Sequence, residues 1–392
     1  MVYSTRKSSL ALAAGAALML FSAWGANSSR AGGTTFGYEA LPPITHANLT
    51  IFPVVAAAGR SHDTRNFLTL DEGLRSGEVV VTEAGSIGPL MRRRRRVPLG
   101  ERPIPPWGDG AQVNRLMLVN NSDRPLILLA GEIVTGGKQD RVVGKDRIVP
   151  PKSDPIDLSV FCVEPGRWVA RSVERTGGGA PRGYPADSFS SFSAQMAQPS
   201  VRKEAMADKD QQKVWDEVHK SAAGMAAALP APAKPALEST SSYAGVMENV
   251  EVQRNLNSVA APIERSYESL IRELRAQNAV GVVVAVNGEI IWADVFASTA
   301  LLEKYWPKLV RSYAAEAMTS RLSRYPDLKW RRADVKSAQA FLERFEGRRE
   351  SVESEPGVYR HTEIYGDSFT AFELASLLPG TGFDVHLAKM TE

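Results

Sequence analysis

The sequence predicts an α+β protein, in which a β-rich N-terminal half packs with a C-terminal half of helices and a β-hairpin. Two observations support this class. Short runs of β-branched and aliphatic residues, separated by turn formers, fill the first half. Beyond residue 261, apolar residues recur at helical spacing around two strand-like runs joined by Asn287-Gly288.

Four strands are expected in the N-terminal half, where apolar runs alternate with clusters of turn-forming residues. They cover residues 78–83, 115–119, 126–130 and 156–163. The turn over residues 120–123 is short enough to join the second and third of these strands. We therefore expect a hairpin there.

Helices are expected in the second half, where apolar residues share one face. A short amphipathic helix covers residues 214–225, and a second helix begins at Pro262, because proline is favoured in a first turn. The hairpin of residues 281–296 follows. A long helix over residues 299–322 comes next, and Pro307 either kinks it or starts its second part. The last helix spans residues 335–345.

The domain organisation follows from composition. Residues 1–31 form a signal peptide, and residues 48–346 form a single domain. Flexible loops are expected near residues 176–199 and 226–242, which are rich in Gly, Ser, Ala and Pro. Residues 347–392 are a C-terminal extension with short strands.

The N-terminus has the features of a secretory signal. Arg6 and Lys7 precede an apolar run at residues 10–21 that is too short to span a bilayer, and small residues follow it. We expect cleavage after Gly25 or Ala31 and a periplasmic or extracellular protein without a stable membrane span. An uncleaved signal anchor is the alternative interpretation.

Export changes the charge of the chain. The full sequence carries 47 basic and 44 acidic residues, and three of the basic residues lie within residues 1–31. The exported chain is therefore formally neutral, which argues against nucleic acid as a partner. The arginine run at 92–96 is a local exception. It either binds an acidic polymer or, as we favour, forms a solvated loop.

Cys162 is the only cysteine, so an intramolecular disulfide is excluded and core burial must provide the stability. Its apolar neighbours Val160, Phe161 and Val163 predict a strand in which the thiol packs as a small hydrophobic group. A thiol nucleophile is the alternative. It needs a nearby base, and all five histidines are distant in the sequence.

Polar residues at predicted strand ends form the candidate site. Most of them lie within residues 126–168, where buried-strand patterning and unusual polar groups occur together. The planar guanidinium groups of Arg141 and Arg167 are suited to binding a carboxylate, phosphate or sulfate. The candidate binding residues are Glu132, Gln139, Arg141, Glu164, Arg167, Trp168 and Asp294.

Asp294 is expected on the second strand of the hairpin. Alternation places it on one face with Ile290, Trp292 and Phe296. A carboxylate among aromatic side chains must be paired, bound by backbone amides or protonated. Capping of the helix expected near Thr299 would satisfy it without any function.

Ion pairing gives the other candidates an equally simple structural explanation. Glu132 with Arg141, and Glu164 with Arg167, would tie neighbouring strand ends together. Structural ion pairs are common, and they perturb charged groups without any function. We therefore favour the structural interpretation over a ligand site.

Four motifs resemble those of a known family. They are LAGEIVTGGKQDR at 129–141, SVFCVEPGRW at 159–168, VGVVVAVNGEIIWADVFAS at 280–298 and KYWPKLVRSYAAEAM at 304–318. In this order they are similar to the ARG and rhodanese-phosphatase-superfamily-associated protein family, over residues 48–346. The resemblance implies a bacterial family of unestablished activity and one domain with a loop between its halves. The arginine run and the tail after about Glu350 lie outside it.

Several common catalytic and cofactor motifs are absent from the sequence. Glu132 stands where a phosphate-binding loop needs its first glycine, and Gln139 stands where it needs serine or threonine. The patterns His-Glu-x-x-His, Cys-x-x-Cys and Gly-x-Ser-x-Gly do not occur. We therefore expect no metal and no cofactor.

Two function classes remain. The first is an exported, non-catalytic ligand-binding or envelope-associated protein, whose partner is an anionic small molecule, a glycan or an envelope protein. The alternative is a hydrolase or transferase with Glu164 or Asp294 as general acid/base. A perturbed carboxylate in an open cavity beside Arg141 or Arg167 would favour the enzyme. The same groups buried in closed pairs would favour a structural role.

Overall fold

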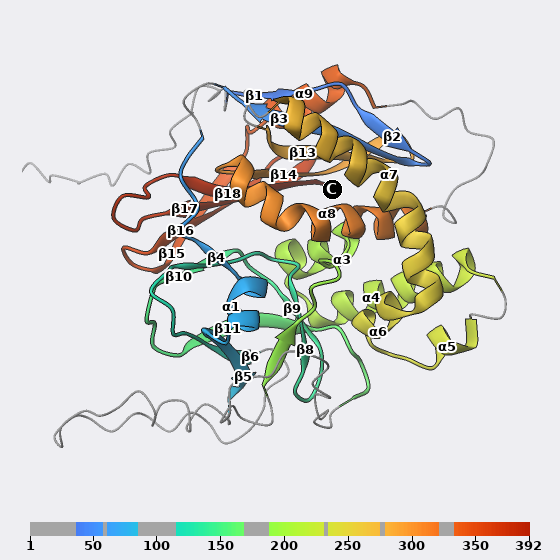
Figure 1. The fold of residues 1–392 in the computed structure, drawn as a ribbon, viewed down its shortest axis with the longest axis horizontal. Coiled ribbons are helices and arrows are strands. Elements are labelled where there is room, and N and C mark those ends of the chain that lie inside the picture. Colours follow the sequence, from blue (N-terminus) through green and yellow to red (C-terminus); the bar gives the residue numbers. More distant parts are fainter. Residues whose placement is uncertain are drawn as a thin grey trace, which may run out of the picture. The chain divides into compact units, whose positions relative to one another are not determined.

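Three antiparallel or mixed β-sheets and the helices around them confirm the α+β class (Figure 1). The computed structural model describes residues 37–57, 61–84, 115–167, 188–230, 234–274, 279–320 and 333–392. These residues all belong to one compact unit. The predicted signal segment 1–31, the arginine run 92–96 and Trp168 lie outside the described residues.

The largest sheet has nine strands in the order β1-β3-β13-β14-β18-β17-β16-β15, and β2 pairs with β3. All of its pairings are antiparallel. Strands from both ends of the described chain share this sheet. They are β1 (Tyr38–Ala40), β2 (Ile44–His46), β3 (Leu49–Ala56), β13 (Ala279–Val286), β14 (Glu289–Phe296), β15 (Arg348–Glu355), β16 (Tyr359–Tyr365), β17 (Phe369–Ser376) and β18 (Asp384–Thr391).

The hairpin of β13 and β14 is confirmed. β13 is buried along its whole length, as expected of a strand covered on both faces. Asn287 and Gly288 form the turn with φ of 53° and 79°, values that these two residues tolerate well. A bulge between the strands places Ile290 on the opposite face from Trp292 and Phe296. The prediction of a common face is therefore wrong for Ile290.

Helices cover both faces of the nine-stranded sheet (Figure 1). α7 (Val250–Leu274) and α8 (Thr299–Ser320) contribute to the core on one face, and α9 (Val335–Glu343) contributes to the core on the other. Pro262 lies inside α7 rather than at its start, and Pro307 lies inside α8. Packing of an apolar helix face on the sheet outweighs the backbone hydrogen bond that each proline removes.

Two smaller sheets form from residues 68–191, and they confirm the four strands predicted there. One has the order β12-β8-β9-β11-β6-β5 and the other β10-β7-β4. α1 (Leu70–Ser76) packs beside them and begins with a capping box of Thr69 and Glu72. The strands are β4 (Leu68–Thr69), β5 (Val79–Glu83), β6 (Arg115–Asn120), β7 (Leu126–Leu128), β8 (Ile133–Gly136), β9 (Arg141–Val143), β10 (Arg147–Val149), β11 (Ile156–Cys162) and β12 (Phe189–Ser191).

The turn at residues 120–123 does not form the predicted hairpin. β6 pairs with β5 and β11, whereas β7 pairs with β4 and β10. The buried Asn120 side chain explains the difference. Its Nδ2 donates to the carbonyl oxygens of Arg124 at 2.8 Å and Pro150 at 3.1 Å, and its Oδ1 accepts from Ser122 N at 3.0 Å. These bonds turn the chain from one sheet into the other.

The stretches expected to be flexible loops contain packed elements where they are described. Within 176–199, Gln195 and Met196 are buried; within 226–242, Leu229 and Leu237 are buried. Scattered apolar residues anchor these Ala- and Ser-rich segments to the core, which composition alone does not predict. The helices here are α3 (Pro199–Lys203), the π-helical segment η2 (Glu204–Asp208), α4 (Gln211–Ala228), which confirms the helix predicted over 214–225, α5 (Lys234–Glu238) and α6 (Tyr243–Glu248).

Residues 347–392 are part of the main sheet, so the prediction of a C-terminal extension is wrong. The predicted short strands are present as β15 to β18. β18 lies between β14 and β17 and pairs with both. Without β18, β14 would have an exposed edge with unpaired backbone groups. The C-terminus therefore completes the sheet.

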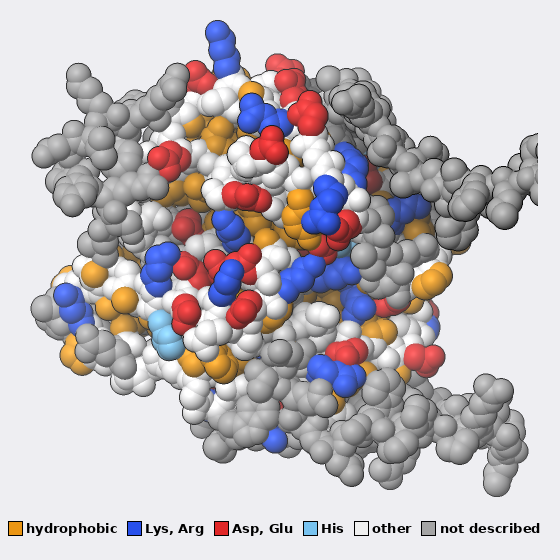
Figure 2. Space-filling model, turned by 180° about the vertical axis from the view of Figure 1, so that it is seen from behind, with side chains coloured by type: hydrophobic (Ala, Val, Ile, Leu, Met, Phe, Trp, Pro, Cys, Tyr) orange, Lys and Arg blue, Asp and Glu red, His pale blue; other side chains and the backbone are white. Residues whose placement is uncertain are grey.

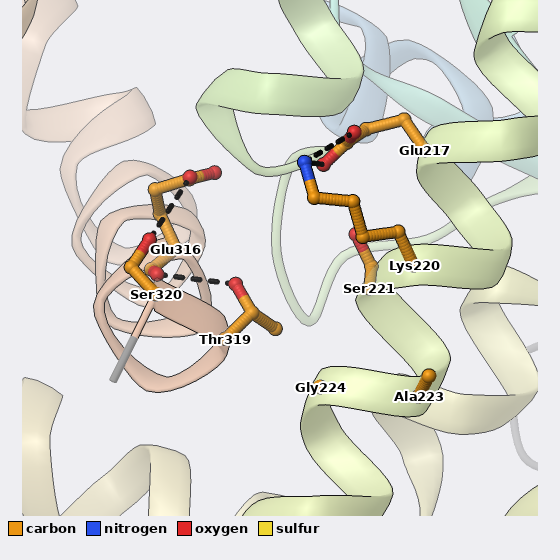
Figure 3. Close-up of a pocket in the computed structure, with 8 residues that line it drawn as sticks. All are labelled: Glu217, Lys220, Ser221, Ala223, Gly224, Glu316, Thr319 and Ser320. Carbon is orange, nitrogen blue, oxygen red and sulfur yellow. Dashed lines mark hydrogen bonds and ion pairs between the residues drawn. The ribbon is translucent and has the colours of Figure 1, made fainter. Parts of the chain in front are cut away.

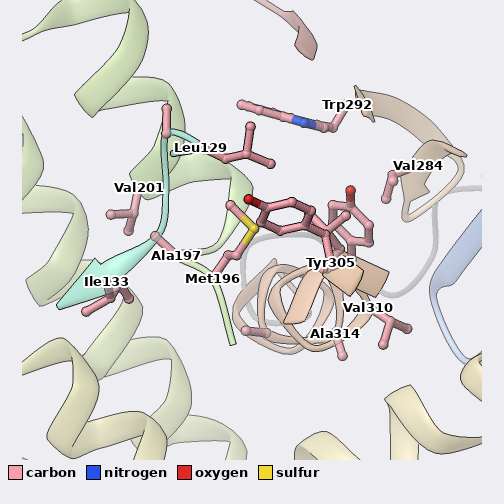
Figure 4. Packing of buried hydrophobic residues seen from close by; sticks show 14 of the residues in the cluster. Leu129, Ile133, Met196, Ala197, Val201, Val284, Trp292, Tyr305, Val310 and Ala314 are labelled. Atoms are coloured by element: carbon pink, nitrogen blue, oxygen red, sulfur yellow. The ribbon is translucent and has the colours of Figure 1, made fainter. Parts of the chain in front are cut away.

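The core around α8 joins the main sheet to the smaller ones. Figure 4 shows Leu129 and Ile133 on one side of this core and Trp292 on another, with Tyr305 of α8 between them. Met196 fills the space beside Tyr305. The turn at residues 129–132, which carries the first candidate site residue, lies at this junction.

Candidate functional site

Gln139, Glu164 and Arg167, three of the five candidates that could converge at neighbouring strand ends, come together where β9 begins and β11 ends. Arg167 Nη2 lies 2.5 Å from Glu164 Oε2, and Arg167 Nη1 donates to Gly137 O at 3.0 Å. Gln139 Nε2 donates to Glu164 O at 3.1 Å. The Arg167 guanidinium, a candidate for binding an anion, is therefore engaged by groups of the chain itself, as the favoured structural interpretation expected. Only 17% of its side chain is exposed.

Asp140, which the sequence analysis did not select, links this cluster to α6. Its backbone nitrogen donates to Glu164 Oε2 at 3.0 Å, and its Oδ1 accepts from Gly136 N at 3.1 Å. Its Oδ2 accepts from Ser242 Oγ at 2.7 Å, and the same hydroxyl caps α6 by accepting from Gly245 N. The arrangement holds a turn and a helix start together.

Arg141 is fully buried in β9, opposite Cys162 of β11. Burial lowers the pKa of Arg141, although the charges of Cys162, Glu83 and Asp140 oppose this shift. Cys162 is buried too, and burial raises the pKa of its thiol. The backbone of Cys162 is bound on both sides by the Gln211 side chain, at 2.8 and 2.9 Å. Its prediction as a core residue is confirmed.

Glu132 lies away from that cluster and pairs with Lys308 of α8. Lys308 Nζ is 3.3 Å from Glu132 Oε1 and 3.1 Å from Asp71 Oδ2. Glu132 Oε2 accepts from Leu129 N at 2.9 Å, which closes the 129–132 turn. Burial raises the pKa of Glu132 to about 7, even though the charge of Lys308 acts to lower it.

Asp294 lies in a third place, within a fully buried network. Arg202 donates to both of its oxygens at 2.9 Å, and Tyr313 Oη donates to Oδ2. His386 Nε2 lies 3.1 Å from Asp294 Oδ1, and His386 Nδ1 lies 2.5 Å from Asp146 Oδ2. We call Asp146, Asp294, Arg202, His386 and Tyr313 the Asp294 network.

Charges in the Asp294 network balance one another. Burial opposes ionisation of Asp294, but Arg202 and His386 outweigh it and hold its pKa well below the usual range. Burial also acts against the charge on His386, but Asp146 and Asp294 together raise its pKa to about 9. Two cations thus face two anions without solvent. The predicted alternative, in which Asp294 caps α8, is wrong, because Ser298 Oγ accepts from Leu301 N instead.

Gly131, within the 129–132 turn, leaves room for the Arg202 side chain of the Asp294 network. Its φ is +93°, and a Cβ there would lie 2.6 Å from Arg202 Cγ. Asp146 Oδ1 accepts from Ala130 N at 2.7 Å, which ties the Asp294 network to the same turn. Residues 129–132 thus lie between the Glu132–Lys308 ion pair and the Asp294 network.

A cavity of about 310 Å³ lies between α4 and α8 (Figure 3). Ser221 is buried, and its Oγ has no hydrogen-bond partner within the described residues. Glu316 Oε2 accepts from Ser200 N at 3.0 Å and Gln198 Nε2 at 3.2 Å. The lining residues are Glu217, Lys220, Ser221, Ala223, Gly224, Glu316, Thr319 and Ser320.

Gly224 lets α4 approach α8 closely at this cavity. A Cβ on Gly224 would lie 3.0 Å from Thr319 Cβ, so a larger residue would push the helices apart. A neighbouring cavity of about 240 Å³ shares Glu217 and Lys220 with the first. None of the predicted site residues lines either cavity.

Some of the missed residues carried a sequence signal. Lys308 interrupts the apolar face of α8 between Tyr305 and Leu309, and His386 precedes Ala388 and Met390 on an inward-facing alternation. Charged or titratable residues at such positions need partners. The cavity residues carried little signal, since a serine such as Ser221 is a common residue on a buried helix face and the others are ordinary polar residues of helices.

Within the part of the chain that the structure describes, no group of three His, Cys, Asp or Glu side chains is arranged to hold a metal ion. No helix of those residues is long and apolar enough to cross a membrane. Figure 2 shows the face opposite to that of Figure 1, where acidic and basic side chains are interspersed.

The chain matches the ARG and Rhodanese-Phosphatase-superfamily-associated Protein domain over residues 37–390. It belongs to this family. The match extends past residues 48–346 at both ends and includes the strands β15 to β18, so the family domain and the nine-stranded sheet coincide at the C-terminus. No curated protein and no solved structure shows a significant match to the chain.

Proposed function

We propose that this member of the ARG and rhodanese-phosphatase-superfamily-associated family is an exported, non-catalytic ligand-binding protein. The observation that carries the proposal is the cavity between α4 and α8. Its lining combines a buried hydroxyl without a partner, on Ser221, with the carboxylate of Glu316. Buried polar groups without partners are uncommon in folded proteins, and a ligand would satisfy these.

The alternative, a hydrolase or transferase, receives less support. General acid/base catalysis needs a carboxylate that can reach a substrate and exchange a proton. Glu164 is ion-paired with Arg167 and also accepts from a backbone amide. Asp294 is bound by Arg202, His386 and Tyr313, and it is fully buried. Both candidates are committed to internal partners.

The ligand class that we propose also differs from the anion that Arg141 and Arg167 suggested. Arg141 is buried and Arg167 donates to carbonyl and carboxylate oxygens of the chain. The α4–α8 cavity instead presents two carboxylates and three hydroxyls, together with one ammonium. This lining suits a small polar molecule or a glycan better than an anion.

Export rests on the pattern of residues 1–31 alone. N-terminal sequencing of the protein from fractionated cells tests it. We expect a chain that begins after Gly25 or Ala31 in the periplasmic or extracellular fraction, where it can meet an envelope component. An intact Met1 terminus in the cytosolic fraction would refute export.

Binding is tested by thermal-shift screening of the mature protein against small polar molecules, glycans and peptides. A ligand at 100 times its Kd should stabilise the protein by about 2.7 kcal/mol. Ala223 is exposed and lines the cavity, so Ala223→Trp should obstruct the cavity without disturbing the core. A ligand that stabilises the wild type and the variant equally would place the site elsewhere. Turnover of a bound compound would favour the enzyme.

A further inference from the structure

The lining of the α4–α8 cavity is unbalanced in charge. Lys220 and Glu217 form an ion pair at 3.0 Å on α4, and Lys220 is 72% exposed at the rim. Glu316 of α8 has no ion pair within the described residues. Burial and the charge of Glu217 raise the pKa of Glu316, while hydrogen bonds from Ser200 and Gln198 act to lower it. The lining therefore carries one uncompensated negative charge.

Glu316 is also placed to act on a ligand. Figure 3 shows its carboxylate pointing from α8 toward α4. Its Oε2 accepts from Ser200 N and Gln198 Nε2, the Ser200 side chain also donates to the carboxylate, and Oε1 accepts from the Ser320 hydroxyl at 3.4 Å. A carboxylate oxygen can accept more than one short hydrogen bond, so Oε1 has capacity for a strong donor.

Hydroxyl groups share the cavity lining with this carboxylate. Ser221 Oγ lies in the same lining without a partner, and Thr319 Oγ1 accepts from Gln198 Nε2 at 3.2 Å while donating to the α8 backbone. An ammonium group has three donors and no acceptor. A lining that contains a carboxylate and hydroxyl oxygens matches that requirement in both charge and hydrogen bonding.

We propose that the α4–α8 cavity binds the primary ammonium group of a small amine, with Glu316 as the counter-charge and Ser221 Oγ as a further acceptor. This inference rests on the proposed ligand-binding function and specifies the class of ligand. The Glu217–Lys220 pair at the rim supplies both signs of charge for the remainder of the molecule.

The test compares 5-amino-1-pentanol with 1,5-pentanediol by isothermal titration calorimetry on the full mature chain at pH 8. The two probes have the same length and differ in one ammonium group. The amine should bind about tenfold or more tightly than the diol, because a hydrogen bond to a charged group contributes enough for a factor of that size. Equal binding of the two probes would overturn the proposal.

Substitutions of cavity residues test whether the amine binds in the α4–α8 cavity. Glu316→Gln should weaken amine binding about tenfold or more, and Ser221→Ala should weaken it by a smaller factor. Glu303→Gln is the matched control, because it removes a carboxylate from an exposed position of the same helix. Unchanged amine binding by Glu316→Gln or Ser221→Ala, in variants that melt like the wild type, would refute the assignment.

The outcomes separate the two proposals. If the amine does not bind but another compound stabilises the wild type and not Ala223→Trp, the ligand class is wrong and the binding function stands. If no compound from the screen depends on Ala223, Ser221 or Glu316, the cavity is not a binding site and both proposals fail.

Discussion

Tyr313 and Glu316 lie about one turn apart on α8 but belong to polar regions of opposite character. Tyr313 donates to Asp294 in a buried network whose two cations and two anions are paired. Glu316 lines a cavity in which, within the described residues, it has no ion pair and its neighbour Ser221 has no hydrogen-bond partner. α8 thus contributes both to the buried Asp294 network, which we call the closed region, and to the α4–α8 cavity, which we call the open region.

The contrast between these two regions of α8 indicates where a binding site can be found in this protein. An unusual charge within apolar strands, such as Asp294 in β14, must find partners before the protein can fold, so it marks architecture. Binding groups must instead remain available. In the α4–α8 cavity they lie between two helices, and a residue such as Ser221 is ordinary in a helix sequence.

The largest expected effect concerns the closed region. Asp294→Ala should lower the free energy of unfolding by about 3–5 kcal/mol, because it leaves the buried charge of Arg202 without its partner. Chemical denaturation measures this change. The matched control is Asp63→Ala, since Asp63 forms an exposed pair with Arg65 at 2.7 Å and its loss should leave the melting temperature unchanged. Similar small losses in both variants would mean that the network is not architectural.

A pH effect of comparable size follows from His386. Its pKa is raised from 6.5 to about 9, so the folded protein holds this proton more tightly than the unfolded chain. The resulting stabilisation is complete below about pH 6.5 and is lost as the pH rises through 9, a change of about 3 kcal/mol. Urea unfolding at a series of pH values measures it.

The variant His386→Gln isolates this titration. Burial lowers the pKa of Lys389 to about 7, and a lowered lysine pKa favours stability as the pH rises over the same interval. Lys389 remains in both proteins, so the difference between their pH profiles belongs to His386. If both profiles fall equally between pH 6.5 and 9, His386 is not the titrating group.

A smaller loss is expected for Arg167→Ala, in the separate cluster around Glu164. It removes the partner of Glu164 and donors to two backbone carbonyls, which should cost about 1–3 kcal/mol. Arg360→Ala, an exposed arginine in β16, provides the control in differential scanning calorimetry. Near-wild-type melting of Arg167→Ala would restore the hypothesis that this guanidinium binds an anionic ligand.

Local patterns were sufficient to predict much of the fold. β13, β14 and their Asn287-Gly288 turn follow from residues adjacent in sequence, and so do α4 and α8. The strand with which a given strand pairs does not follow from adjacent residues. β18 inserts between β14 and β17 across about ninety residues of chain, and nothing in its sequence specifies that neighbour. The predicted extension was wrong for this reason.

The candidate site was likewise predicted only where neighbouring residues determine it. Five residues were expected to converge if their strands are neighbours: Glu132, Gln139, Arg141, Glu164 and Arg167. Gln139, Glu164 and Arg167 do, because β9 and β11 bring them together, whereas Glu132 pairs with Lys308 instead. Asp294 was expected to need a partner, but no pattern in the sequence pointed to Arg202, which lies in α3 about ninety residues earlier in the chain. The α4–α8 cavity depends on how two helices pack, and no local pattern of Ser221 or Glu316 encodes that.

Two buried serines provide the finest test of the contrast between the regions. Ser242 Oγ donates to Asp140 at 2.7 Å and accepts from Gly245 N at 3.0 Å, so Ser242→Ala should cost about 1–3 kcal/mol through a lost helix cap and an unsatisfied carboxylate oxygen. Ser221 is as deeply buried but has no such bonds within the described residues. Its replacement by alanine removes an unsatisfied hydroxyl, so it should leave stability unchanged or raise it by up to about 1 kcal/mol. Thermal melting of the two variants compares them directly, without any ligand. A loss in Ser221→Ala equal to that in Ser242→Ala would show that the Ser221 hydroxyl serves the fold, and the cavity would then lose the feature that distinguishes it from the fully bonded groups around Asp140.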